Sequence, residues 1–174
     1  MVVLDGLDGA RPSDVWQGYC VHSRPMPQRH CVLFIEDDGE GVRAFRDAFD
    51  RLSEIYAVHV VKSGAEALSY IKGIGKYAHR EEYPTPTVVV AGAAGEDELR
   101  AVEWVRGQRE LDWVRVIVMV DCEDEEIIAR AYQAGAHSCL VKSEDFTELR
   151  DILTLVGRYW MECNQIPSLS ESMT

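Results

Sequence analysis

The sequence predicts an α/β domain built on a five-stranded parallel sheet, because two kinds of segment alternate over residues 30–163. Five short apolar runs, most of them rich in Val or Ile, have the composition of strands that are covered on both faces. Five other segments repeat their apolar residues every three or four positions, as one face of a helix does. Strands that alternate with helices favour a parallel sheet with right-handed crossovers.

The predicted elements follow one another in a regular order along the chain. We expect strands at residues 31–35, 56–61, 87–91, 116–120 and 139–141, and helices that include residues 42–52, 65–71, 99–105, 127–132 and 146–160. Ser63 and Glu66 have the spacing of a capping box that opens the second helix. Gly135 predicts the end of the fourth helix. Tyr159 and Trp160 end the fifth helix, where large aromatic side chains fit either the core or a dimer interface.

Length, composition and charge define a single acidic domain. The 174 residues leave room for one core, and 47% apolar and 28% charged residues are ordinary for a globular protein. Residues 1–29 predict a flexible N-terminal extension and residues 164–174 a C-terminal tail. The extension is neutral and the tail carries only Glu171, so −11 of the net charge of −12 falls on residues 30–163. An acidic body argues against nucleic acid and membrane as ligands and permits a basic protein partner.

We expect a cytoplasmic protein, because the sequence shows no membrane-spanning or signal segment and its cysteines have the pattern of reduced thiols. No apolar stretch approaches the roughly 18–20 residues that cross a bilayer, and acidic residues come too soon for a signal peptide. Five cysteines without a Cys-x-x-Cys pair indicate reduced thiols. Cys20, His22, His30 and Cys31 lack the spacing of a zinc finger, and Cys31 belongs to a predicted strand. The sequence therefore disfavours a zinc site.

The polar residues of interest follow the predicted strands directly. In parallel α/β sheets the functional crevice lies at the carboxyl ends of the strands. The residues at those ends are Glu36, Asp37, Asp38, Gly92, Val120, Asp121 and Lys142. We therefore expect them to converge in space.

Three motifs carry a resemblance to the receiver domains of two-component response regulators. Residues 32–38 (VLFIEDD) place an acidic cluster after an apolar run, residues 86–92 (PTVVVAG) resemble the third strand of a receiver, and residues 134–142 (AGAHSCLVK) resemble its end. The resemblance covers about residues 30–163. It implies a flavodoxin-like, doubly wound parallel sheet with the strand order 2-1-3-4-5.

Two further segments narrow the resemblance to single-domain response regulators that serve phytochrome-type histidine kinases. One is the extended link at residues 73–84 (GIGKYAHREEYP) before the third strand. The other is the ending DFTEL at residues 145–149, which leads to GRYW at residues 157–160. No output domain follows within the chain, so we expect any output to pass through a protein partner.

Several positions depart from the receiver pattern together. The resemblance places Gly92 where a working receiver holds the aspartate that accepts a phosphoryl group, and glycine has no carboxylate. Val120 stands at the position of a Ser or Thr hydroxyl, and Cys139 at that of the aromatic switch residue. Ser143 replaces the proline after the lysine, and the loop at residues 93–97 looks about two residues short. We interpret the domain as a pseudo-receiver without a catalytic residue.

The acidic pair Glu36 and Asp37 and the lysine Lys142 are the receiver positions that remain. In a working receiver the acidic pair holds Mg²⁺, which prefers oxygen ligands in octahedral geometry. Without the acceptor carboxylate we expect no cofactor, and weak Mg²⁺ binding at Glu36 and Asp37 at most. The alternative to a residual metal or phosphate site is a structural ion pair across the crevice, which we favour.

Two other carboxylates are candidates for a substitute role. Asp121 follows Val120 and would serve as a replacement acceptor or ligand. The simpler interpretation makes it the start of an acidic cap on the fourth helix, which the helix dipole favours. Asp38 is a spare acceptor in the same sense, or more simply a helix cap. Cys139 and Cys122 are expected to be small packing residues.

The leading hypothesis is a non-enzymatic, phosphorylation-independent binding module in bacterial two-component signalling. Its expected partner is a histidine kinase, another receiver or an output protein. Receiver domains often associate through the fourth helix, fifth strand and fifth helix, so the resemblance also suggests a homodimer through these elements. The alternatives are an unconventional receiver that uses Asp121 or Asp38, and a small flavodoxin-like nucleotide binder. The second has weak support, since the loop at residues 92–95 (GAAG) lacks a nucleotide-binding motif.

Overall fold

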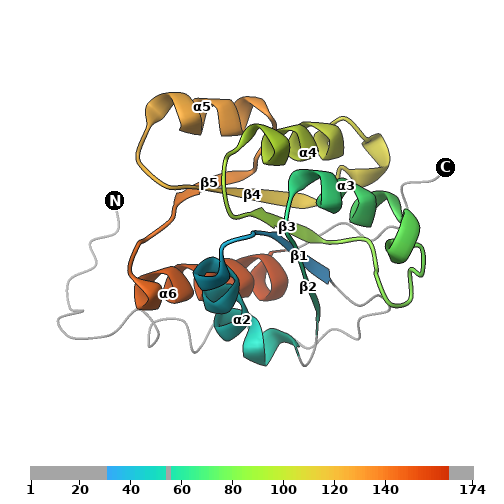
Figure 1. Cartoon of the computed structure of the whole chain (residues 1–174), viewed down its shortest axis with the longest axis horizontal. Coiled ribbons are helices and arrows are strands. Elements are labelled where there is room, and N and C mark those ends of the chain that lie inside the picture. The colour runs from blue at the N-terminus through green and yellow to red at the C-terminus, as the bar shows by residue number, and fades with distance from the viewer. Residues whose placement is uncertain (1–30, 54–55, 165–174) are drawn as a thin grey trace.

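Five parallel strands form one sheet in a computed structural model that describes residues 31–53 and 56–164 (Figure 1). The strands are β1 (Cys31–Ile35), β2 (Ala57–Val61), β3 (Val88–Ala91), β4 (Arg115–Val120) and β5 (Ser138–Val141). They lie in the order β2-β1-β3-β4-β5, and every neighbouring pair is parallel. The flavodoxin-like fold and strand order implied by the receiver resemblance are confirmed.

Within the described residues, five α-helices cover the two faces of the sheet. They are α2 (Gly39–Ser53), α3 (Gly64–Lys72), α4 (Glu96–Arg106), α5 (Glu125–Gln133) and α6 (Phe146–Gly157). Short helical turns follow at η1 (Gly75–Tyr77) and η2 (Arg109–Leu111), and a π-helical segment, η3 (Arg158–Cys163), extends α6. Helices α2 and α6 lie side by side on one face, while α3, α4 and α5 lie on the other (Figure 1).

The alternation of side chains along each strand builds two cores. In β1, Leu33 and Ile35 join the core beneath α3, α4 and α5, whereas Val32 and Phe34 join the core beneath α2 and α6. All five residues of β1 are buried, as a central strand covered on both faces requires. This packing fixes the carboxyl ends of β1, β3, β4 and β5 at one edge of the sheet, where the site lies.

Helix ends follow the predicted capping chemistry. The Ser63 hydroxyl accepts the N–H of Glu66, while the Glu66 carboxylate accepts the N–H of Lys62, one residue before the cap. Gly135, with φ of 101°, follows the end of α5 as predicted. Tyr132, the last residue of the apolar pattern that predicts this helix at residues 127–132, is exposed and does not join the core.

Some sequence predictions concern residues that the structure does not describe. These are the extension at residues 1–29, the tail beyond residue 164 and three of the zinc candidates, Cys20, His22 and His30. Among the helices that are described, none is both long enough and apolar enough to cross a bilayer.

Candidate functional site

A buried ion pair links the ends of β1 and β5. The Lys142 ammonium donates to Oε2 of Glu36 over 2.7 Å, and the two side chains are 18% and 4% exposed. Oε1 of Glu36 accepts the backbone N–H groups of Asp37 at 3.1 Å and Asp38 at 3.0 Å. Both carboxylate oxygens are therefore occupied by protein donors. The expected ion pair joins Glu36 and Lys142, whereas the side chain of Asp37 is exposed and takes no part.

Two glycines make room for the Glu36 carboxylate. A Cβ atom at Gly92 would collide with Oε2 of Glu36, well inside the 3.0 Å that real Cβ contacts keep. A Cβ atom at Gly41 would lie 2.9 Å from the same oxygen. The backbone at Gly92 is also held, since its N–H donates to the Ile35 carbonyl at 2.8 Å. The carboxylate of Glu36 therefore fills the space beside the end of β3 that a side chain at position 92 would need.

The end of β4 brings no hydroxyl to the crevice. Val120 is buried, and its carbonyl accepts the N–H of Lys142 at 2.7 Å. Asp121 is exposed and precedes α5 by several residues. The cap of α5 is Asp124, which accepts the N–H groups of Glu126 and Ile127. The interpretation of Asp121 as part of a helix cap is therefore wrong, because the loop after β4 is longer than the sequence pattern indicated.

Asp38 is a helix cap, as the simpler interpretation held. Its Oδ2 accepts the N–H of Gly41 at 2.7 Å, in the first turn of α2. This bond places the start of α2 directly above Glu36 and brings Gly41 against its carboxylate. The three acidic residues therefore have different roles. Glu36 binds the lysine, Asp38 caps the helix and Asp37 faces solvent.

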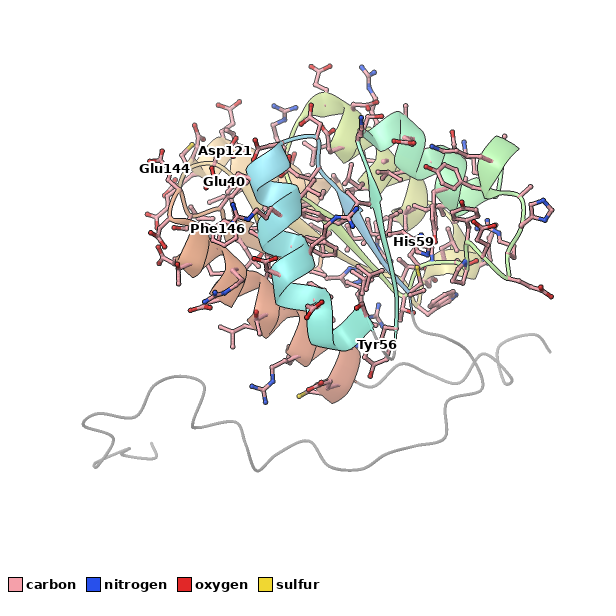
Figure 2. The ribbon with its side chains drawn as sticks, turned by 60° about the horizontal axis from the view of Figure 1, so that its bottom comes forward. Glu40, Tyr56, His59, Asp121, Glu144 and Phe146 are labelled. Atoms are coloured by element: carbon pink, nitrogen blue, oxygen red, sulfur yellow. The ribbon has the colours of Figure 1, made fainter. Side chains whose placement is uncertain are left out.

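An open cavity of about 340 Å³ lies next to the ion pair. Its lining comes from the start of α2, the loop after β4, the loop between β5 and α6, and the first turn of α6. The lining residues are Asp38, Glu40, Gly41, Asp121, Lys142, Ser143, Glu144, Phe146 and Leu149. Figure 2 shows Glu40, Asp121, Glu144 and Phe146 gathered at one corner of the molecule. Glu40, Glu144 and Phe146 were not predicted from sequence, and their places after strands β1 and β5 are the signal that was available.

Cys139 lies in β5 at the position that the resemblance equates with the switch aromatic. It is half-buried against the core, and burial raises the pKa of its thiol. Its backbone N–H donates to the Tyr132 hydroxyl at 3.3 Å. Cys139 is thus a packing residue, as predicted, whereas Cys122 is exposed and that prediction was wrong for it.

Among the residues that the structure describes, the metal candidates do not assemble into a ligand set. No three His, Cys, Asp or Glu side chains within residues 31–53 and 56–164 are placed to hold a metal ion. Cys31, the described member of the zinc candidates, lies in β1, where burial raises the pKa of its thiol to about 11. A thiol that resists ionisation is a poor metal ligand, because the thiolate is the binding form.

The doubly wound sheet with the strand order β2-β1-β3-β4-β5 is the fold of solved receiver domains. Among solved structures, the phosphorylated cyanobacterial phytochrome response regulator RcpA superposes with a TM-score of 0.73 at 19% identity, covering 81% of this chain and 100% of that one. Over 139 residues, the chain is 22% identical to a probable methanogenesis regulatory protein, FilR2, from Methanothrix harundinacea (78% of this chain, 86% of the relative). It is 17% identical to the response regulator Rcp1 from Synechocystis (79% and 92%). No protein-family model matches the chain.

Proposed function

We propose that this chain is a receiver-type signalling module that binds a protein partner and accepts no phosphoryl group. The observation that carries the proposal is the place of the Glu36 carboxylate, which fills the space in front of Gly92 and is bound to Lys142. An acyl phosphate needs a carboxylate with a free oxygen in the crevice. Both oxygens of Glu36 are engaged, and Gly92 offers none.

The rest of the crevice supports the same proposal. Val120 has no hydroxyl to bond a phosphoryl oxygen, and the pairing of Lys142 with Glu36 occupies the cation that would neutralise one. Glu36 already accepts two backbone N–H groups on Oε1 and the Lys142 ammonium on Oε2, so Mg²⁺ would compete with Lys142 for Oε2. The proposal therefore includes no cofactor and no enzymatic activity.

The expected partner is a protein of a two-component pathway. The names of the relatives support this class, since one is a response regulator and another a regulatory protein. A homodimer through α5, β5 and α6 is a second form of the proposal. These elements, with the segment η3 that extends α6, expose four large apolar side chains, Tyr132, Val141, Leu155 and Tyr159. Exposed aromatic side chains are common at protein interfaces.

The second candidate function is an unconventional phosphoacceptor. It is favoured by one observation, that Asp121 and Asp38 line the same cavity as Lys142. In that case either carboxylate would replace the missing one at position 92. Asp38 is the weaker choice, because one of its oxygens already caps α2.

The proposal is tested with a small phosphodonor such as phosphoramidate in the presence of Mg²⁺. We expect no phosphate adduct on the wild-type chain by intact-mass spectrometry, while a receiver that retains its aspartate is phosphorylated in parallel. A stoichiometric adduct would overturn the proposal. Loss of that adduct in Asp121→Asn or in Asp38→Asn would then identify the acceptor.

A further inference from the structure

The cavity beside the ion pair has an acidic rim and an apolar floor. Four carboxylates from three separate elements stand around it, namely Asp38, Glu40, Asp121 and Glu144. Phe146 and Leu149 of α6 form the apolar part of the lining. Lys142 is the cation of the lining, and its charge is matched by Glu36. The cavity therefore keeps a net negative charge over a nonpolar surface.

The rim carboxylates have almost no protein partners. Within the residues that the structure describes, none of the four forms an ion pair, and only Asp38 has a hydrogen bond, to the Gly41 N–H. Like charges that gather around one hollow repel one another, and a cation that enters it relieves the repulsion. The charge pattern thus specifies the sign of the ligand.

The apolar floor indicates what kind of cation fits. Phe146 already has the Arg43 guanidinium over its ring, 4.7 Å from the centroid, although Arg43 is not among the residues that line the cavity. The ring therefore accepts a guanidinium, and Leu149 beside it suits an aliphatic stem. Arg and Lys side chains combine such a stem with a charged head. A small metal ion would use the carboxylates alone and leave the floor uncovered.

We propose that this cavity receives an arginine or lysine side chain of a protein partner, with the stem on Phe146 and Leu149 and the charged head among the rim carboxylates. The inference rests on the proposed function and deepens it, since it assigns the partner a basic docking surface. Charge complementarity is the reason for this choice. A second copy of the chain, with a net charge of −12, suits this acidic cavity less well, and a homodimer would instead use the apolar surface of α5, β5 and α6.

The test is an NMR titration of the ¹⁵N-labelled full chain with the peptide acetyl-Ala-Arg-Ala-amide. A matched peptide carries citrulline, which has nearly the shape of arginine without its charge. We expect saturable shifts at the backbone amides of Glu40, Asp121, Ser143 and Glu144 with the arginine peptide and none with the citrulline peptide. The double variant Asp121→Asn/Glu144→Gln should bind roughly fivefold more weakly, since each exposed charge pair contributes modestly.

A second double variant separates the cavity from the general charge of the protein. Glu81→Gln/Glu82→Gln removes the same charge from exposed positions outside the cavity and should leave the affinity unchanged. Equal shifts with citrulline, or equal weakening in both double variants, would overturn the proposal. The proposal would also be overturned if MgCl₂ at matched ionic strength shifted the same amide resonances and the arginine peptide did not displace the Mg²⁺. If these results came together with an absence of phosphorylation, the proposed function would stand and only the basic partner would be lost.

Discussion

Two glutamate–lysine ion pairs of nearly equal length lie in very different surroundings. Glu36 and Lys142 are joined at 2.7 Å with side chains 4% and 18% exposed, whereas Glu66 and Lys76 are joined at 2.8 Å with side chains 27% and 68% exposed. Distance alone therefore does not distinguish them. Burial does, because a charge without its partner is costly in the interior and is solvated at the surface.

The hydrogen bonds of the two glutamates show how burial changes the role of a pair. Glu36 accepts two backbone N–H groups and a lysine in the crevice, and this holds the ends of β1 and β5 together. Glu66 accepts the Lys62 N–H, the Lys76 ammonium and the Tyr77 hydroxyl, and this ties α3 to the turn η1 that follows it. The first pair joins two strand ends across the crevice, and the second holds the turn η1 against α3.

The largest effect is expected when each lysine is removed in turn. Lys142→Met leaves the Glu36 carboxylate buried without its cation and should lower the free energy of unfolding by about 3 kcal/mol. Lys76→Met should lower the urea midpoint only slightly, because an exposed ion pair contributes little to the free energy of unfolding. Urea unfolding of both variants at pH 7 measures the difference. Equal losses would show that the crevice pair is not distinguished by its burial.

A somewhat smaller effect is expected from filling the space that Glu36 occupies. Gly92→Ala should destabilise the fold by about 2 kcal/mol, because the new methyl group collides with a carboxylate that three donors hold in place. Gly39→Ala is the matched control, since nothing lies within 4 Å of a Cβ atom there.

The same collision gives a coupling test. In a Glu36→Ala background the cost of Gly92→Ala should fall to well under half, because the colliding oxygen is gone. Urea midpoints of the two single variants and the double variant measure the coupling. An undiminished cost would assign the collision to the Ile35 carbonyl of β1, 3.0 Å from the same Cβ position, instead of to Glu36.

Sequence reasoning recovered the fold well, for a physical reason. The Val-rich strands and amphipathic helices are local patterns that repeat five times. The folded chain forms all ten elements, with ends that differ by a few residues from the predicted ones. The convergence of Glu36, Gly92 and Lys142 also followed from the sequence, because parallel strands deliver their carboxyl ends to one edge.

The parts that sequence reasoning missed depend on three-dimensional fit. Nothing in the spacing of residues indicates that Glu36 would fill the space in front of Gly92, or that Gly41 would make room for it. The wrong assignment of Asp121 has a similar origin. A run of five acidic residues among positions 121–126 marks a helix start, and only the backbone of the folded chain selects Asp124 as the cap.

The smallest expected effect concerns the exposed pair and its pH dependence. Bonds from the Lys62 N–H, the Lys76 ammonium and the Tyr77 hydroxyl lower the pKa of Glu66 from 4.5 to about 2. Because the folded pKa lies below the unfolded one, the contribution of Glu66 to stability is present above pH 4.5 and is lost as the pH falls toward 2. Glu66→Gln should therefore narrow its stability gap to the wild type over that interval.

Urea midpoints of the wild type and Glu66→Gln, taken in steps from pH 5 to pH 2.5, measure this gap. Glu81→Gln serves as the control, because that residue is exposed and its carboxylate makes no ion pair within the described chain. Its gap to the wild type should stay constant with pH. If the Glu66→Gln gap stayed constant as well, the bonds to Lys62, Lys76 and Tyr77 would not favour the ionised carboxylate. The exposed pair would then contribute nothing measurable to the free energy of unfolding, and the difference in contribution between the two pairs would be larger.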